Sequence, residues 1–243
     1  MRRTWVRPFM LNVKNLSVWY GATEVLRDVS FSVAKGQIIA LMGGNGAGKS
    51  TTLNALSGLL KPKSGSIVFE DHDVCGKSPH EIVSFGLAQV PQGRYCWPTM
   101  TVRDNLELGA ITRNDKHGIA SDFEDALTIF PVLKQRLNSR AGTLSGGQQQ
   151  MVAISRALMA RPRLLLMDEP SHGLSPKVVE EVIQAVRILQ ERGLTILLVE
   201  QNVGVAASLA SSAHVLRNGE IVLSAPGKDL LDNPDLLKSY LGR

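Results

Sequence analysis

A glycine-rich segment that ends in lysine and serine carries the strongest chemical signal in the sequence. Residues 43–50 read GGNGAGKS, which matches G-x-x-x-x-G-K-[S/T] and lies between a short apolar run and a helical pattern. Glycines let successive backbone N–H groups converge on phosphate oxygens, and the positive end of the following helix points at the same atoms. The segment therefore predicts a nucleotide site. We expect Lys49 to reach the β- and γ-phosphates and Ser50 to ligate Mg²⁺. The predicted nucleotide contacts in this segment are Gly43, Gly44, Asn45, Gly46, Ala47, Gly48, Lys49, Ser50 and Thr51.

An apolar strand that ends in two acids is the second signal. Residues 164–170 read LLLMDEP, and a buried strand of this kind delivers Asp168 and Glu169 to the carboxyl edge of a sheet, where α/β proteins bind ligands. We expect Asp168 to hold Mg²⁺ through water and Glu169 to polarise the attacking water as general base. Acids at a strand end also serve as helix caps, which is the simpler alternative.

A pair of glycines at the start of a helix is the third signal. In TLSGGQQQMVAI, residues 143–154, Ser145 is a good N-cap, and one cap does not require Gly146 and Gly147 behind it. Glycines at a helix start cost backbone entropy unless something must approach the chain closely. The alternative is a glycine-rich cap with no ligand.

Composition bounds the class of protein. The chain has 243 residues, of which 44% are hydrophobic, so it can bury one large core. The net charge is +5, but the chain contains no dense Lys/Arg run and only 5% aromatic residues, so we expect no nucleic-acid partner. Cys75 and Cys96 form no metal-ligand or disulfide framework, which favours a reducing compartment. No apolar run approaches the roughly 18 residues that span a bilayer, so a membrane role must come through a partner.

Apolar strands alternate with helices along the chain, and this pattern predicts an α/β fold with a mostly parallel sheet covered on both faces. Alternating residues after Leu11 predict strands, Asn218-Gly219 predicts a hairpin turn, and PDLLKSYLG at 234–242 predicts a short helix. Residues 99–142 change to amphipathic helices, in MTVRDNLELGA and FEDALTIFPVLKQRL, joined by a polar TRNDKHG link. We interpret 93–155 as a helical insertion.

The order of the three signals resembles the ATP-binding cassette (ABC) family of transport ATPases. The resemblance implies a P-loop NTPase (RecA-like) core with an antiparallel β subdomain and an inserted α-helical subdomain. It implies one domain over 10–243, with the core in 10–92 and 156–243, the helical subdomain in 93–155, and residues 1–9 as an extension.

The resemblance also assigns roles to individual residues. In that family the LSGGQ loop contacts the γ-phosphate held by a second subunit, so two cassettes enclose two ATPs. The implied contacts across the dimer are Ser145, Gly146, Gly147 and Gln148. Tyr20 matches the aromatic residue that stacks on adenine, and Gln92 matches the glutamine that senses Mg²⁺ and links to the helical subdomain.

Within the family, the segments VPQGRYCWPTMTVRDNLELG, DEPSHGLSP, LLVEQNV and the terminal YLGR resemble the second ATPase of branched-chain amino acid importers. This implies an ATP-hydrolysing subunit at the cytoplasmic face of the inner membrane. The implied partners are a second ABC ATPase subunit, identical or different, integral membrane permease subunits and, indirectly, a solute-binding protein. The alternatives are a related urea, amide or other amino acid importer, and a soluble ABC ATPase without a transport role.

Two positions depart from the general ABC pattern. Ser175 stands where most cassettes have an aspartate, and Gln201 stands where most have a switch histidine. Glutamine can donate a hydrogen bond to the γ-phosphate but cannot carry a proton, so we retain Gln201 as a catalytic candidate and expect weak hydrolysis by the isolated chain. His172 is interpreted as a solvated loop residue, with a γ-phosphate contact as the alternative. For Arg94 and Trp97, a contact to a membrane subunit and plain surface packing remain equally open.

Overall fold

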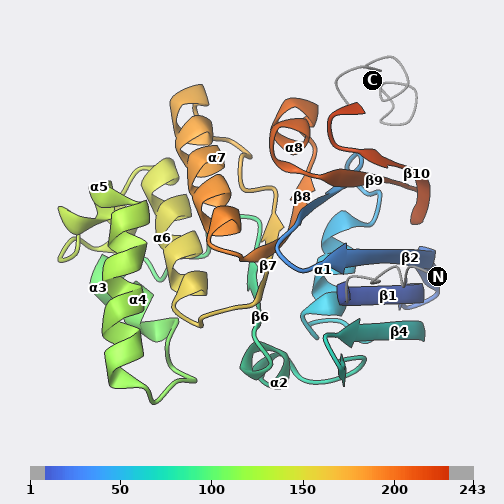
Figure 1. The fold of residues 1–243 in the computed structure, drawn as a ribbon, viewed down its shortest axis with the longest axis horizontal. Coiled ribbons are helices and arrows are strands. Elements are labelled where there is room, and N and C mark those ends of the chain that lie inside the picture. The colour runs from blue at the N-terminus through green and yellow to red at the C-terminus, as the bar shows by residue number, and fades with distance from the viewer. Residues whose placement is uncertain (1–8, 230–243) are drawn as a thin grey trace, which may run out of the picture.

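Two sheets organise the computed structural model, which describes residues 9–229 (Figure 1). The larger sheet has the strand order β10-β9-β3-β8-β7-β6, and the smaller has the order β2-β1-β4-β5. In the larger sheet β9, β3, β8, β7 and β6 pair in parallel, and only β10 is antiparallel. All pairs of the smaller sheet are antiparallel. The predicted fold class, a P-loop NTPase core with an antiparallel β subdomain and inserted helices, is confirmed.

The strands of the larger sheet are β3 Ile38–Met42, β6 Leu87–Val90, β7 Leu164–Asp168, β8 Thr195–Glu200, β9 Ser212–Arg217 and β10 Glu220–Pro226. Those of the smaller sheet are β1 Phe9–Tyr20, β2 Thr23–Ala34, β4 Ser64–Phe69 and β5 His72–Asp73. The helices are α1 Lys49–Leu56, α2 Pro79–Ser84, α3 Val102–Leu108, α4 Lys116–Ile129, α5 Pro131–Lys134, α6 Gly146–Leu158, α7 Pro176–Glu191 and α8 Val203–Leu209, with a 3₁₀ turn η1 at Ala141–Thr143.

The central strands β3, β7 and β8 are buried on both faces, which explains their unbroken apolar sequences. In β3 the alternate residues Ile39 and Leu41 enter a core shared with α1 and the smaller sheet. Ile38, Ala40 and Met42 enter a second core, shared with the helices α3 to α8. Because successive strand residues point to opposite faces, one apolar strand serves both cores.

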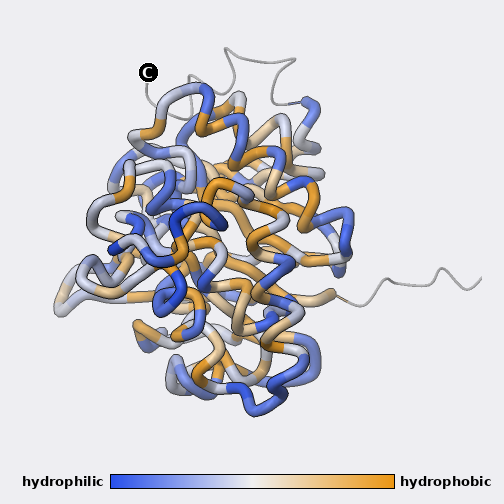
Figure 2. Tube along the Cα trace, turned by 90° about the vertical axis from the view of Figure 1, so that its left-hand side faces the viewer, coloured by the Kyte–Doolittle hydropathy of each residue, from blue (hydrophilic) through white to orange (hydrophobic). Residues whose placement is uncertain are grey.

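The helices α3 to α6 lie to one side of the larger sheet, and the smaller sheet lies on the other side (Figure 1). Figure 2 shows the apolar stretches gathered in the interior and the hydrophilic stretches around the outside. Within residues 9–229 no helix is both long enough and apolar enough to cross a bilayer.

Some predicted boundaries were wrong. The polar TRNDKHG link was expected to separate two helices, but α4 already begins at Lys116 after Asp115. Arg113 explains the turn, because its guanidinium pairs with Asp115 at 2.7 Å and with Asp122 at 2.6 Å and so holds the loop against the helix. The hairpin at Asn218-Gly219 is confirmed, with both residues at positive φ. The helix predicted for 234–242 lies outside the described residues.

We predict that His214 makes the fold less stable as the pH falls. Its half-buried ring in β9 lies 2.7 Å from Ser224 Oγ through Nδ1, and burial lowers its pKa below the ordinary value. On acidification His214 therefore becomes protonated near pH 6.5 in the unfolded chain, and only at lower pH in the folded protein. The free energy of unfolding should fall as the pH drops below that value, by about 1.4 kcal/mol per unit of pKa difference.

Urea unfolding at pH 7.5, 6.5 and 5.5 checks this against His214→Gln, which keeps a polar partner for Ser224. The buried acids Asp168 and Glu200, whose pKa values are raised by burial, titrate in both proteins and shift stability in the opposite direction. The wild type should lose more stability than the variant on acidification. Parallel curves for the two proteins would contradict the prediction.

Candidate functional site

The glycine-rich loop joins β3 to α1 and bends back on itself through Gly48. Gly48 is the N-cap of α1 in the left-handed region, at φ 109°, and a Cβ there would come within 2.5 Å of Leu26. Only glycine combines this conformation with this packing. The turn buries Lys49, whose Nζ donates to the carbonyl oxygens of Gly43 at 2.9 Å and Gly44 at 3.1 Å. The lysine side chain is thus bonded to the first two residues of its own loop.

Lys49 also forms a buried ion pair with Glu169. Lys49 Nζ lies 3.1 Å from Glu169 Oε1, and the two side chains are only 5% and 8% exposed. Gln92, which follows β6, donates from Nε2 to the other carboxylate oxygen of Glu169 at 3.0 Å. Glu169 has φ 46°, an unusual conformation for a side-chain-bearing residue, and its N–H donates to Val199 at 2.9 Å. Three segments far apart in sequence therefore converge on one carboxylate.

Two cavities meet at this carboxylate. The first, of about 260 Å³, contains most of the predicted phosphate contacts and is lined by Val25, Asn45, Gly46, Gly48, Lys49, Ser50, Thr51, Gln92 and Glu169. The second, of about 420 Å³, is lined by Gln92, Gly93, Arg94, Tyr95, Gln149, Gln150, Glu169 and His172. Gln92 and Glu169 line both. The catalytic candidate therefore stands between the phosphate loop and helix α6.

Asp168 has the surroundings of a cation ligand. It is 4% exposed at the end of β7, and its Oδ1 has no hydrogen-bond partner among the described residues. Burial raises its pKa, while the nearby Ser50 hydroxyl and Lys49 act in the lowering direction. Carboxylate, hydroxyl and amide oxygens are ligands that suit Mg²⁺, which is commonly bound through one or two carboxylates and the substrate phosphates. Asp168, Ser50 and Gln92 together fit such an ion.

Glu200 is a buried acid that the sequence analysis did not single out. It is 2% exposed at the end of β8, accepts the N–H of Ser171 at 3.1 Å and that of Asn202 at 3.4 Å, and burial raises its pKa. These bonds tie the segment after Glu169 to the neighbouring strand. The available signal was a charged residue that ends an otherwise apolar strand.

The LSGGQ segment begins helix α6 with a capping box. Ser145 Oγ accepts from Gln148 N–H at 3.3 Å, and the Gln148 side chain accepts from Ser145 N–H at 3.1 Å. A Cβ at Gly147 would come 2.6 Å from a methyl group of Val178 on α7, and one at Gly146 would overlap the Arg94 guanidinium. Packing against α7 therefore disfavours a side chain at Gly147, and a side chain at Gly146 would have to displace the Arg94 guanidinium. Both contacts add an intramolecular reason to the ligand expected from the sequence.

The remaining candidates lie around the periphery. Tyr20 ends β1 with 49% exposure, as a ligand-stacking ring requires, but it does not line the first cavity. Gln201 follows β8 in a bend, and its side chain makes no hydrogen bond within residues 9–229. His172 is 68% exposed, and its Nδ1 lies 3.6 Å from Glu169 Oε2. Ser175 is the N-cap of α7 without a side-chain cap bond.

Comparison with known proteins agrees with this geometry. The family model described as ABC transporter matches residues 26–172. The high-affinity branched-chain amino acid transport ATP-binding protein BraG of Pseudomonas aeruginosa is 44% identical over 96% of this chain and all of its own length. A nucleotide-free ATP-binding cassette from an ABC transporter superposes with a TM-score of 0.86 at 29% identity, covering 97% of this chain and 100% of that one.

A dimeric ATP-binding cassette in a post-hydrolysis state with ADP and Pi is 27% identical, with a TM-score of 0.80, and covers 89% of this chain and 98% of its own. The chain therefore belongs to the ABC transporter family, and it is an ATP-binding ATPase of that family.

We predict that the effect of Gly147→Ala on stability changes sign with residue 178. In the wild type the new methyl group meets Val178, and overpacking of this kind costs about 1–3 kcal/mol, more than the gain of up to about 1 kcal/mol for alanine in a helix. With Val178→Ala both methyl contacts are removed and the Cβ of residue 178 remains at 3.3 Å, a contact that a small shift relieves, so the helix gain should prevail. Urea unfolding of all four proteins checks this. Destabilisation by Gly147→Ala in both backgrounds would show that another contact requires the glycine.

Proposed function

We propose that this chain is the ATP-hydrolysing subunit of an importer for branched-chain amino acids. The observation that carries the catalytic part is the convergence of Lys49, Gln92 and Glu169 on one buried point between the two cavities. The substrate follows from the relative BraG, a branched-chain amino acid transport protein that matches over nearly the whole chain. Transport of urea, an amide or another amino acid is the alternative.

Hydrolysis would use the residues in the roles expected from the sequence. The loop 43–51 and Lys49 would bind the phosphates, and Glu169 would accept a proton from water as its oxygen attacks the γ-phosphorus and the bond to the β-phosphate oxygen breaks, releasing ADP and phosphate. Ser50, Gln92 and Asp168 would hold Mg²⁺, which neutralises charge on the phosphates when bound. Tyr20 would stack on adenine, and Gln201 would donate to the γ-phosphate.

A second cassette would complete the site. The residues Ser145, Gly146, Gly147 and Gln148 would face the γ-phosphate bound by a second ABC ATPase subunit, identical or different. Support comes from the dimeric cassette that this chain resembles over 89% of its length and from the exposed helix start at Ser145. The N-terminal turn of α6 carries positive partial charge, which favours an anionic ligand there.

The permease would dock beside the second cavity. Tyr95 and Trp97, in the segment between Gln92 and α3, are 67% and 54% exposed, and exposed aromatic rings are enriched at protein interfaces. We place the core in 10–92 and 156–243 and the permease-binding helical subdomain in 93–155, with residues 1–9 as an extension. The complex would lie at the cytoplasmic face of the inner membrane, with a solute-binding protein as an indirect partner.

Glu169→Gln should separate nucleotide binding from turnover. The variant keeps the shape of the side chain but cannot accept a proton, so kcat should fall by about 10²–10⁴-fold, while binding of MgATP should be retained because Glu169 no longer competes for Lys49. Lys49→Ala should lose nucleotide binding itself. Steady-state hydrolysis and fluorescent-nucleotide titration check both, over a range of protein concentrations.

Ser145→Arg is the matched control for assembly. It should spare MgATP binding by the single chain yet stop turnover, because Ser145 would contact the γ-phosphate bound by the second subunit. Equal turnover by Glu169→Gln and the wild type would contradict the assignment of the base.

Uptake measurements should identify the solute. In cells that lack the gene, the wild-type chain should restore accumulation of labelled leucine, isoleucine and valine, and Lys49→Ala expressed at the same level should not. Unlabelled urea and arginine in excess should leave that uptake unchanged. Restoration of urea or amide uptake without leucine uptake would replace the proposed solute and leave the ATPase assignment intact.

A further inference from the structure

Arg94 bridges three segments of the proposed site. Its Nη2 donates to the carbonyl oxygens of Gly173 at 3.1 Å and His172 at 3.5 Å, in the loop that follows Glu169. Its Nη1 lies against Gly146, at the first turn of α6, where a Cβ would overlap it and would come 2.8 Å from Cζ. Arg94 lies two residues after Gln92, so its side chain connects the Gln92 segment to the loop after Glu169 and to the start of α6.

The backbone and charge of Arg94 are unusual for a surface residue. Gly93 and Arg94 are both in the left-handed region, at φ 97° and 68°, a conformation that is costly for a long side chain and persists where surrounding contacts hold it. Arg94 is half-buried and forms no ion pair with any carboxylate in the described part of the chain. Its guanidinium also faces the positive end of α6, which repels it. Within the described residues, the two carbonyl oxygens are the hydrogen-bond partners of its side chain.

The bridge reaches the base through His172. The two carbonyl bonds fix the backbone at 172–173, and the His172 side chain from that backbone lies 3.6 Å from Glu169 Oε2. The same cavity holds Gln150 of α6, 4% exposed, whose amide nitrogen has no hydrogen-bond partner in the range 9–229. Arg94 thus joins the loop to the start of α6 beside this cavity, and its removal would take away the two carbonyl bonds between them.

We propose that Arg94 is a positioning residue that holds the loop of Glu169 at a set distance from the start of α6, and that Gly146 is a glycine because this guanidinium occupies its side-chain space. The inference rests on the proposed function, since it concerns turnover at the same site. Arg94 also precedes Tyr95, where we propose that the permease docks. Movement of this segment would therefore reach the loop that follows Glu169 through the Arg94 side chain.

A double-mutant cycle tests the bridge. Arg94→Asn removes the guanidinium and, as asparagine, tolerates the left-handed conformation. Gly146→Ala leaves Arg94 in the chain but pushes its guanidinium away from the two carbonyl oxygens. Because a displacement of about 1 Å in a catalytic group can lower a rate by about 10²-fold, each variant should lower kcat by roughly ten- to a hundredfold. In Arg94→Asn the KM for ATP should stay within about twofold, since Arg94 does not line the phosphate cavity.

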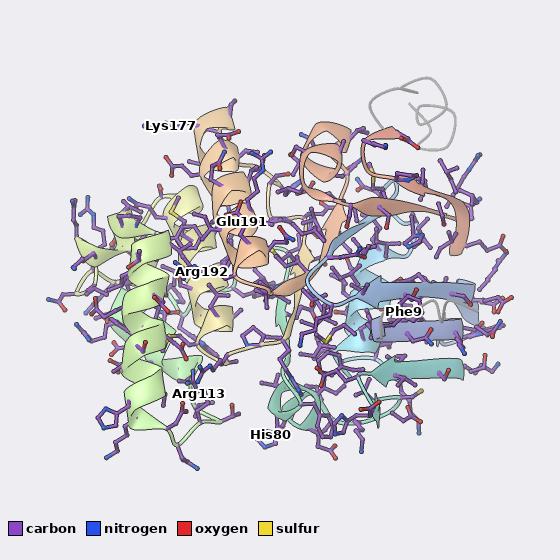
Figure 3. The ribbon with its side chains drawn as sticks, viewed as in Figure 1. Phe9, His80, Arg113, Lys177, Glu191 and Arg192 are labelled. Carbon is purple, nitrogen blue, oxygen red and sulfur yellow. The ribbon has the colours of Figure 1, made fainter. Side chains whose placement is uncertain are left out.

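The double variant distinguishes a shared bridge from two separate roles. It should be no slower than the slower single variant, because both changes remove one interaction. Arg94→Lys, which keeps a cation without the planar fork, should recover part of the loss. Arg192→Ala is the matched control, since Arg192 lies at the far end of α7 from Lys177, with only a 3.9 Å pair to Asp125 (Figure 3), and it should behave as wild type.

Two results would overturn the proposal, namely wild-type kcat in Arg94→Asn, or losses that multiply in the double variant, which would mean that Gly146 serves only a ligand. If the wild type itself does not hydrolyse ATP at any concentration, the proposed function fails instead. The bridge is then judged by the melting temperatures of the same four proteins without nucleotide. Non-additive shifts support the contact, and additive shifts reject it.

Discussion

The buried ion pair between Lys49 and Glu169 is the constraint on which the site depends. Two charges that are each less than a tenth exposed are held only because several other groups bond them, the two loop carbonyls on one side and Gln92 on the other. Separating such a pair without a substitute costs about 3–5 kcal/mol. In the proposed function a triphosphate would be that substitute, since its oxygens can accept hydrogen bonds from Lys49. Under that proposal, nucleotide binding and the separation of Glu169 from Lys49 would occur together, so the fold must keep both residues within reach of the same point.

The order of strands provides this. In β3-β8-β7-β6 all four strands are parallel, so the segments that follow them leave the sheet at one edge. The segments after β3, β7 and β6 carry Lys49, Glu169 and Gln92 respectively, and β8 ends in Glu200. β8 lies between the strands of the ion pair, and its last residue, Glu200, accepts N–H bonds from Ser171 and Asn202 rather than joining the pair. Glu200 thereby holds the loop that follows Glu169 without pairing with Lys49.

Much of this was available from the sequence because it depends on local patterns. The glycine loop, the acidic end of an apolar strand and the Asn218-Gly219 turn each have a short-range chemical reason, and so the sheet edge could be predicted. Contacts that long side chains make with residues elsewhere in the fold could not be predicted from the sequence. The pairing of Arg113 with Asp115 and Asp122, which starts α4 early, joins residues with no sequence period, and the burial of Glu200 depends on two strands closing over it. The roles of Gln201 and Tyr20 depend on a ligand and on a partner, which a single chain's packing does not determine.

The glycine pair in LSGGQ illustrates why a motif can have two causes. A ligand that must approach a helix start and a side chain of the same protein that already occupies that space impose the same requirement, the absence of a Cβ. Gly147 meets Val178 of α7, and Gly146 meets the movable guanidinium of Arg94, so both glycines already have a neighbour within their own chain. The two causes differ in what happens when the neighbour is removed: an intramolecular clash disappears with the neighbour, whereas a requirement set by a phosphate does not. A glycine motif at a subunit boundary is therefore informative about the partner only after the contacts within its own chain have been accounted for.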